Sequence, residues 1–241
     1  MVYLTGFHAI EERIKSGRGC GALLVAKTGP RGGKIVNLAV KTGTPLKRSG
    51  SHELDSLAPD NRGIALEVED SAAANSFDGV DGFLASLPEN ADALAVILDE
   101  ITDPHNYGAI LRSCEQFAVD VVITRNRRIA KNAAVISKTS AGADAWVKVV
   151  EAPNLQRAAQ DLKDAGFWIY GADMRGEPLY TKKAAKRTAL VLGGEAGLSR
   201  LLKESCDATL SIPSLGKIDS LNVSVAAGIF LYEVYRQKNA V

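Results

Sequence analysis

The sequence predicts an α/β protein with a parallel-sheet domain in its C-terminal part and a small α/β unit before it. One reason is that short apolar runs after residue 92 alternate with helical stretches, which is typical of a parallel sheet covered on both faces. A second reason is the composition of residues 70–93, where small, acidic and turn-forming residues indicate a connector. We therefore expect a small domain at 1–70, a linker at 71–92 and a larger domain at 93–241.

The small unit is expected to combine two helices with two strands. Helical patterns cover 8–15 and 34–40, and apolar runs at 22–26 and 64–69 indicate strands. The stretch between them, 27–34, reads KTGPRGGK and is expected to be a glycine-rich basic loop. Its glycines permit close approach of a phosphate and its cations supply charge, although a plain surface loop explains the same residues. It lacks the order of residues of a Walker loop.

The larger domain is expected to hold six strands, and its last helix is expected to be buried. The predicted strands are 93–98, 120–125, 145–150, 167–172, 189–194 and 208–213. A short helix within 77–87 precedes them, and the segment 220–237 is apolar almost all round, which is typical of a buried helix. In parallel sheets the ligand crevice lies beyond the carboxyl ends of the strands. The loops after the first, fifth and sixth strands are therefore the places to look for chemistry.

Composition excludes several classes of protein. Hydrophobic residues make up 46% and charged residues 24%, as in an ordinary globular protein. No apolar run approaches the roughly 20 residues of a membrane span. The first residues lack the features of a secretory signal, and the three cysteines are far apart, so we expect reduced thiols and a cytoplasmic protein. The three histidines are scattered, and we expect no metal site.

Charge is distributed unevenly along the chain although the net charge is only +1. Residues 1–50 carry nine Lys or Arg against two acidic residues, and residues 51–90 carry one against nine. A basic lobe can attract phosphate locally even when the whole protein is nearly neutral. Solvated faces that happen to cluster would give the same pattern.

The loop after the first predicted strand reads DEITDPHNYGAILRS, residues 99–113. Asp103 and Asn106 are good helix-start residues, and Pro104 suits the first helical position because it has no N–H to donate. Gly108 relieves crowding at the first turn, and Arg112 follows one turn later on the same face. A capped turn with a surface arginine explains this loop as well as one wall of a site does.

Two later loops also combine glycine with polar residues. Residues 192–199, LGGEAGLS, let backbone groups approach a flat ligand, and their spacing does not meet the dinucleotide fingerprint. In residues 211–228, SIPSLGKIDSLNVSVAAG, Ser220 or Asp219 can cap the final helix. Helix capping explains Asn222 less well, because an amide in apolar surroundings needs a partner.

In this order and at these separations, the three loops resemble the three motifs of the SpoU (TrmH) family of RNA ribose 2′-O-methyltransferases. The resemblance spans about residues 93–238, and the N-terminal GFHAIEERI resembles the small substrate-binding domain of that family. The layout is most similar to the branch that methylates a guanosine ribose of 23S ribosomal RNA. The resemblance implies a C-terminal trefoil knot, S-adenosyl-L-methionine as the cofactor, RNA as the substrate and a homodimer.

The resemblance also implies roles for individual residues. Arg112 engages the ribose 2′-hydroxyl, and Asn106, Glu195, Ser220 and Asn222 match the other polar positions of the site. The matched cofactor positions, whose backbone groups would meet the adenine, are Gly193, Ile212 and Leu221. The segment TSAGAD, residues 139–144, resembles a family loop near the site. Glu195 is expected to hold Arg112 or Asn222 by charge-assisted hydrogen bonds.

Basic residues outside these motifs are candidates for RNA contacts. They are Lys27, Arg31, Lys34, Lys47, Arg48, Arg125, Arg127 and Arg128. Within the enzyme class, a transfer-RNA ribose methyltransferase or an enzyme that modifies the ribosome to confer resistance remains an alternative. Outside it, the alternative is a catalytically silent RNA-binding factor for ribosome assembly.

Overall fold

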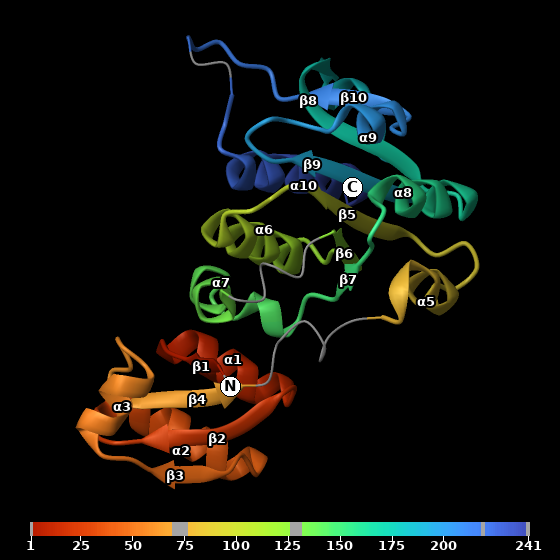
Figure 1. The fold of residues 1–241 in the computed structure, drawn as a ribbon. Helices are drawn as coiled ribbons and strands as arrows, with labels where there is room; N and C mark the ends of the chain where they lie inside the picture. The colour runs from red at the N-terminus through yellow and green to blue at the C-terminus, as the bar shows by residue number, and fades with distance from the viewer. Residues whose placement is uncertain (1, 69–76, 126–131, 218–219, 240–241) are drawn as a thin grey trace.

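The computed structural model describes residues 2–68, 77–125, 132–217 and 220–239, which form two α/β units (Figure 1). The N-terminal unit, residues 2–68, has a four-stranded sheet in the order β1-β4-β2-β3. Its strands are β1 Val2–Leu4, β2 Cys20–Val25, β3 Leu46–Arg48 and β4 Ile64–Val68. Its helices are α1 Phe7–Ser16, α2 Pro30–Thr42 and α3 Ser51–Leu57. β2 and β3 pair in parallel, whereas β4 runs antiparallel to both β1 and β2.

The expected helices and strands of the N-terminal unit are present, and three further elements join them. α2 begins at Pro30, so the predicted loop 27–34 is wrong in its second half. Proline at the first helical position is favoured because its fixed φ suits the helix and its missing N–H needs no partner. β1, β3 and α3 were not predicted, since elements of three to seven residues carry little periodic pattern.

The C-terminal unit, the described residues from 77 to 239, has a six-stranded sheet in the order β10-β8-β9-β5-β6-β7. Every neighbouring pair in it is parallel, which confirms the predicted sheet type. The strands are β5 Ala93–Asp99, β6 Val121–Thr124, β7 Val149–Glu151, β8 Trp168–Pro178, β9 Arg187–Gly193 and β10 Ala208–Ser211. The predicted strand at 145–150 is largely wrong, because a 3₁₀ turn, Ala143–Ala145, occupies its start and β7 begins only at Val149.

Helices cover both faces of this sheet (Figure 1). They are α5 Gly79–Ser86, α6 Pro104–Gln116, α7 Ala133–Thr139, α8 Leu155–Asp164, α9 Arg200–Glu204 and α10 Val223–Asn239. β5 explains the two layers, because all seven of its residues are buried and residues 93–98 alternate between two cores. Leu94, Val96 and Leu98 pack with α6 and α10, whereas Ala95 and Ile97 pack with α5, α8 and α9.

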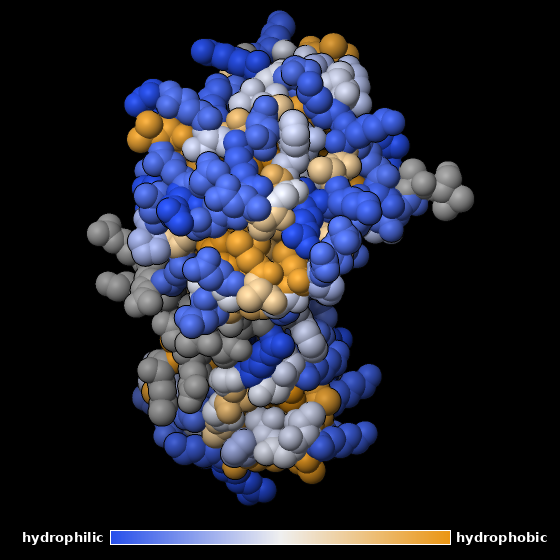
Figure 2. All heavy atoms as spheres, turned by 90° about the vertical axis from the view of Figure 1, so that its right-hand side faces the viewer, coloured by the Kyte–Doolittle hydropathy of each residue, from blue (hydrophilic) through white to orange (hydrophobic). Residues whose placement is uncertain are grey.

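The surface of the α5 side is mostly hydrophilic, as Figure 2 shows, and hydrophobic residues gather on it at the level of α5. From α5 itself, Val80 and Phe83 enter the core of the C-terminal unit, and the Phe83 ring lies 6.1 Å from that of Phe167. Among the residues that the structure describes, no helix has both the length and the apolar character needed to cross a membrane.

The final helix differs from its prediction in its start and in its burial. α10 begins at Val223 because Asn222 caps it, accepting hydrogen bonds at Oδ1 from the Ser224 amide at 2.9 Å and the Ser224 hydroxyl at 2.6 Å. Phe230 and Leu231 are buried against the sheet. Tyr232 is 53% exposed and Val225 51% exposed, so the expectation of a fully buried helix is wrong: one side of α10 faces solvent in this chain.

Candidate active site

The first loop leads from the buried end of β5 into α6. Asp103 caps the helix, since its two carboxylate oxygens accept from the amides of His105 at 3.1 Å and Asn106 at 3.3 Å. Gly108 is needed for a different reason than the turn itself. A Cβ at this position would overlap the Thr139 hydroxyl, so glycine lets α7 lie directly against the first turn of α6.

The second loop, residues 193–199, is held on the end of β5. The Gly194 amide donates to the Asp99 carbonyl at 2.9 Å, and the Ser199 amide donates to Asp99 Oδ2 at 2.8 Å. Gly193 has no room for a Cβ, because one would overlap the backbone of Gly197. Asp99 is 1% exposed, so this buried carboxylate at the end of β5 fixes the loop that follows β9.

The third loop joins the first through two amide side chains. Asn222 Nδ2 donates to Asn106 Oδ1 at 2.9 Å, across 116 residues of sequence. Asn222 is exposed and caps α10, so the expectation of an amide in apolar surroundings that capping explains poorly is wrong, although the side chain does have this second partner. Because Asn222 also caps α10, one side chain fixes the start of that helix against the start of α6.

These three loops surround one cavity of about 590 Å³, a volume within the range of small-molecule sites. Its lining includes seven of the eight predicted catalytic and cofactor residues: Asn106, Gly193, Glu195, Ile212, Ser220, Leu221 and Asn222. Leu192, Leu210 and Phe230 add apolar wall. The mixture of apolar walls, polar side chains and crowded glycine backbone suits a flat ligand with hydrogen-bonding edges.

Arg112 is the predicted residue that does not line this cavity. Arg112 lies six positions after Asn106 on α6, roughly 9 Å farther along the helix axis. Arg112 is also exposed. Within the part of the chain that the structure describes, its guanidinium has no hydrogen-bond or ion-pair partner. Glu195 likewise makes no hydrogen bond to Arg112 or Asn222 among those residues, so the expected link between them is not formed here.

The cavity has a charged wall that the sequence interpretation missed. Asp173, Met174 and Arg175 lie in the second half of β8, and Lys203 of α9 reaches the same wall. Lys203 Nζ lies 2.5 Å from Asp173 Oδ2, and the Arg175 amide donates to Asp173 Oδ1 at 2.8 Å. The hydrogen bond from Lys203 lowers the pKa of the Asp173 carboxyl. A usable signal was the pair of charged residues, Asp173 and Arg175, directly after the apolar run of a parallel strand.

The candidate RNA-binding residues that the structure describes lie in several places. Lys27 lines a hollow of about 520 Å³ together with Thr28 and Arg62. Arg31 and Lys34 line another hollow of about 490 Å³, where Arg31 pairs with Glu11 at 3.1 Å. Lys47 and Arg48 lie exposed in β3, and Arg125 is exposed directly after β6. Arg127 and Arg128 lie outside the described residues.

Segment 139–144, which resembled a family loop near the site, contacts α6 through Thr139 and also lies where the two units meet. Ser140 and Asp144 are buried there, and Asp144 pairs with Arg13 of the N-terminal unit. In the described ranges, no group of three or more His, Cys, Asp or Glu side chains is arranged to hold a metal ion.

Comparison with known proteins adds independent information on both units. Residues 93–232 match the sequence profile of the SpoU rRNA methylase family. Residues 3–73 match a profile described as RNA 2′-O ribose methyltransferase substrate binding. A tRNA/rRNA methyltransferase of Borreliella burgdorferi is 39% identical over 220 residues, which cover 88% of this chain and 96% of the relative.

Two further similarities extend over nearly the whole chain. YacO of Bacillus subtilis, a TrmH family tRNA/rRNA methyltransferase, is 33% identical and aligns with 99% of this chain and 97% of its own length. Among solved structures, the SpoU methyltransferase AviRb of Streptomyces viridochromogenes, crystallised in complex with AdoMet, superposes with a TM-score of 0.79. That match covers 99% of this chain and 90% of AviRb at 22% identity, so it supports the fold.

Proposed function

The chain belongs to the SpoU rRNA methylase family of RNA methyltransferases, and from this premise we propose that it transfers a methyl group from S-adenosylmethionine to a ribose 2′-hydroxyl of RNA. The observation that carries the proposal is the convergence of three distant loops on one cavity, joined by the bond between Asn222 and Asn106. A guanosine of 23S ribosomal RNA is the proposed target, as the order of the motifs suggested.

The cavity fits the proposed cofactor in size and in chemistry. Gly193 and Gly194 stand where a Cβ would overlap neighbouring backbone, so the chain there presents peptide groups that can read the edge of an adenine. Ile212 and Leu221 supply apolar surface for its ring. Bound there, S-adenosylmethionine would supply a methyl group already activated by its sulfonium. Asp173, Arg175 and Lys203 offer charges of both signs for the amino and carboxylate groups of its methionine part.

The residues around the cavity then act on the ribose. A ribose hydroxyl is a weak nucleophile until its proton leaves or its developing charge is stabilised. A guanidinium keeps its proton in ordinary surroundings, so we assign Arg112 to orient the ribose–phosphate and to stabilise negative charge on the attacking oxygen. The hydrogen bond between Asn106 and Asn222 holds the first and third loops together on the cofactor side of the site. Ser220 and Glu195 add polar groups to the cavity wall.

The N-terminal part of the chain is proposed to bind the RNA. In this proposal residues 1–70 form the substrate-binding domain, 71–92 a linker and 93–241 the methyltransferase domain. The match of residues 3–73 to a substrate-binding profile and the basic composition of residues 1–50 support this division. Its candidate phosphate contacts include Lys27, Arg31 and Lys34, which are exposed, and Arg125, Arg127 and Arg128 are candidates in the C-terminal part of the chain.

Three features of the family belong to the same proposal. They are a trefoil knot in the C-terminal part, a homodimer and a cytoplasmic location. The presence of Ile212, Ser214 and residues 220–222 in the cavity lining beside residues 193–197 is compatible with a knot. The solvent-facing side of α10, where the rings of Tyr232 and Tyr235 meet that of Phe117 edge-on and tilted, offers an apolar surface for a second copy of the chain.

Mass mapping of nucleosides tests the function. Ribosomal and transfer RNA from cells with and without the gene would be compared for 2′-O-methyl marks, and the proposal expects one ribosomal mark to disappear. Loss of a mark from transfer RNA alone would establish the tRNA alternative, and loss at a ribosomal drug site with a change in susceptibility would establish a resistance enzyme. If no mark changes, the enzyme function fails. A titration with S-adenosylmethionine separates a silent assembly factor, which has no reason to bind it.

A further inference from the structure

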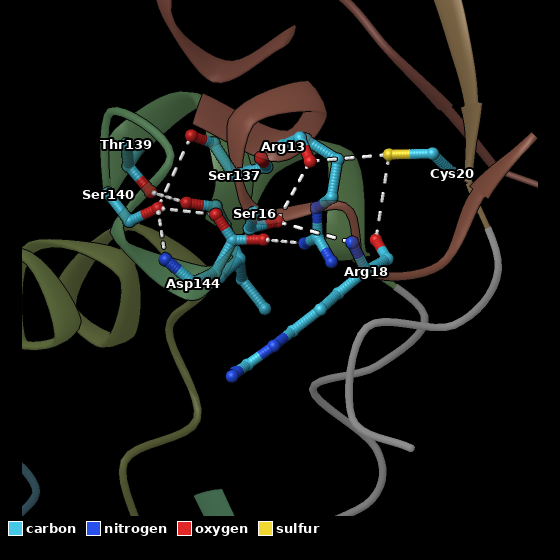
Figure 3. A network of polar contacts seen from close by, with 9 residues as sticks. Arg13, Ser16, Arg18, Cys20, Ser137, Thr139, Ser140 and Asp144 are labelled. Atoms are coloured by element: carbon cyan, nitrogen blue, oxygen red, sulfur yellow. Dashed lines mark hydrogen bonds and ion pairs between the residues drawn. The ribbon is translucent and has the colours of Figure 1, made fainter. Parts of the chain in front are cut away.

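The two units are joined by an ion pair that is buried at their interface. Arg13 lies on α1 of the N-terminal unit, and Asp144 lies in the 3₁₀ turn that precedes β7 of the C-terminal unit. Arg13 Nη2 is 2.5 Å from Asp144 Oδ2, and the two side chains are 1% and 4% exposed. The pair joins residues 131 positions apart, and Figure 3 shows it within a network of polar contacts.

Exposed contacts surround this buried centre. Trp146 Nε1 donates to Glu12 at 3.1 Å, and Lys138 Nζ of α7 lies 3.6 Å from Asp60 of the N-terminal unit. Gly142 packs so closely on α1 that a Cβ would meet Glu12 at 2.8 Å. The interface thus combines a buried ion pair with exposed polar contacts, whereas the buried part of a usual interface is apolar and poor in charged residues.

The C-terminal side of the pair is connected to the candidate active site through α7. Asp144 Oδ1 accepts a hydrogen bond from Ser140 at 3.0 Å, directly after α7. The preceding residue, Thr139, places its hydroxyl where a Gly108 side chain would stand, against the first turn of α6. That turn carries Asn106 and leads to Arg112. The element that receives Arg13 is therefore packed on the helix that carries the proposed chemistry.

A buried ion pair of this kind selects one geometry. The other two guanidinium nitrogens of Arg13, Nε and Nη1, have no hydrogen-bond partner among the described residues. The positive charge of Arg13 is therefore compensated by Asp144. Any other docking of the two units that kept Arg13 buried would leave its guanidinium without a counter-ion, which is strongly unfavourable. Such a pair contributes more to selecting one arrangement of the two units than to the free energy of unfolding.

We infer that Arg13 and Asp144 are positioning residues for the RNA. They hold the substrate-binding unit in one orientation relative to α6, so that an RNA touching both units meets phosphate contacts and the methyl-transfer site at a fixed separation. This inference rests on the proposed function. If loss of the pair leaves the competent orientation only about one-tenth populated, the apparent dissociation constant for RNA rises about tenfold, because it scales inversely with that population. Cofactor binding, which uses the C-terminal unit alone, does not change.

The test compares Asp144→Asn with the wild-type chain. Asparagine keeps the shape and can still accept from Ser140, but it removes the charge that Arg13 faces. Arg13→Lys keeps a cation and should show a smaller effect. Arg157→Met is the matched control, because it removes an arginine from an exposed pair with Asp161 on α8, away from the interface. Thermal unfolding and a titration with S-adenosylmethionine identify any variant that has lost its fold.

Two readouts are needed. The first is the distance distribution between spin labels at Val40→Cys on α2 and Ala85→Cys on α5, both at exposed positions. Cys20 and Cys206 are replaced by serine in this background, and Cys114 is fully buried. The second is binding and methylation of ribosomal RNA from cells lacking the gene, with KM and kcat measured separately.

The inference expects Asp144→Asn to broaden the label distances and raise the KM for RNA about tenfold, with kcat and cofactor affinity unchanged. It is overturned if the distances stay narrow, or if they broaden while RNA binding stays equal to that of the wild type. If the wild-type chain binds RNA and the binding curve of Asp144→Asn coincides with the wild-type curve, only this inference is removed. A wild-type chain that binds neither RNA nor cofactor removes the proposed function as well.

Discussion

Asn222 Nδ2 donates a hydrogen bond of 2.9 Å to Asn106 Oδ1, and the same Asn222 caps α10 through its Oδ1. A single amide therefore uses its donor to hold the third loop to the first and its acceptor to start the last helix. The two functions can be separated chemically, because a carboxylate retains the acceptor and loses the donor.

We expect Asn222→Asp to keep the stability of α10 and to weaken cofactor binding. The aspartate can still cap the helix, whereas it cannot donate to Asn106 and the two loops lose their link. Asn222→Ala removes the cap as well, which should lower the free energy of unfolding by about 1 kcal/mol. Thermal unfolding and cofactor titration measured together on both variants check this. Equal cofactor affinity in Asn222→Asp and the wild type would mean that the link has no role in binding.

Arg112→Ala is expected to keep cofactor binding and to lose methyl transfer. Arg112 is exposed and outside the lining of the cavity, so its removal leaves the walls intact. Loss of one group that stabilises transition-state charge typically costs about 10²–10³ in kcat. Arg112→Lys keeps a charge but not the planar fork, and should retain a fraction of the rate. Loss of cofactor binding with normal residual chemistry would contradict the role assigned to Arg112.

Gly193→Ala should damage the cavity, whereas Gly216→Ala should not. A Cβ at Gly193 overlaps the backbone of Gly197, and forcing it in costs about 1–3 kcal/mol of stability. Gly216 lies in the third loop with its nearest neighbour, the Ser214 hydroxyl, at 3.8 Å, which is ordinary contact. Unfolding and cofactor binding of the two variants form a matched pair. If the two variants unfold alike and bind the cofactor alike, the crowded backbone of residues 193–197 is not part of the wall that binds the cofactor.

The pair of Lys203 and Asp173 predicts a specific pH dependence. Lys203 lowers the pKa of Asp173 in the folded chain, so this carboxyl contributes stability above its unfolded pKa and loses it as the pH falls through the lower folded value. Lys203→Met should therefore raise the pKa of Asp173 and destabilise the protein most near neutral pH. The difference should vanish in acid. Carboxyl titration by NMR with unfolding at several pH values checks it, and a difference that does not vary with pH would contradict it.

The C-terminal sheet was predictable where its residues are buried on both sides. Residues 93–98 of β5 form a continuous apolar run because each of them enters one of two cores, and this pattern is visible in the sequence alone. The strand predicted at 145–150 failed because Ala145 and Val147 are buried in a turn near the junction of the two units. Their apolar character reflects contacts that involve distant parts of the chain, which a local pattern does not contain.

The site was predictable to the extent that its chemistry follows strands along the chain. Asn106, Glu195 and Asn222 each follow an apolar run and are found around one cavity. The bond partner of Asn222 and the ion pair of Lys203 with Asp173 were not predictable, because they join residues 116 and 30 positions apart. The same holds for Arg13 and Asp144, whose pairing depends on how two separate units dock.

The cavity is lined by residues from Asn106 to Phe230, and its third wall is anchored by the capping of α10. During synthesis the ribosome releases the chain from its N-terminus, so the small N-terminal unit and the first strands can fold while residues 220–230 are still inside the exit tunnel. A growing chain therefore cannot bind the methyl donor until almost all of it has emerged. Cofactor binding therefore becomes possible only late in synthesis. A chain on a ribosome stalled before Ser220 should have a folded N-terminal unit and no affinity for the cofactor.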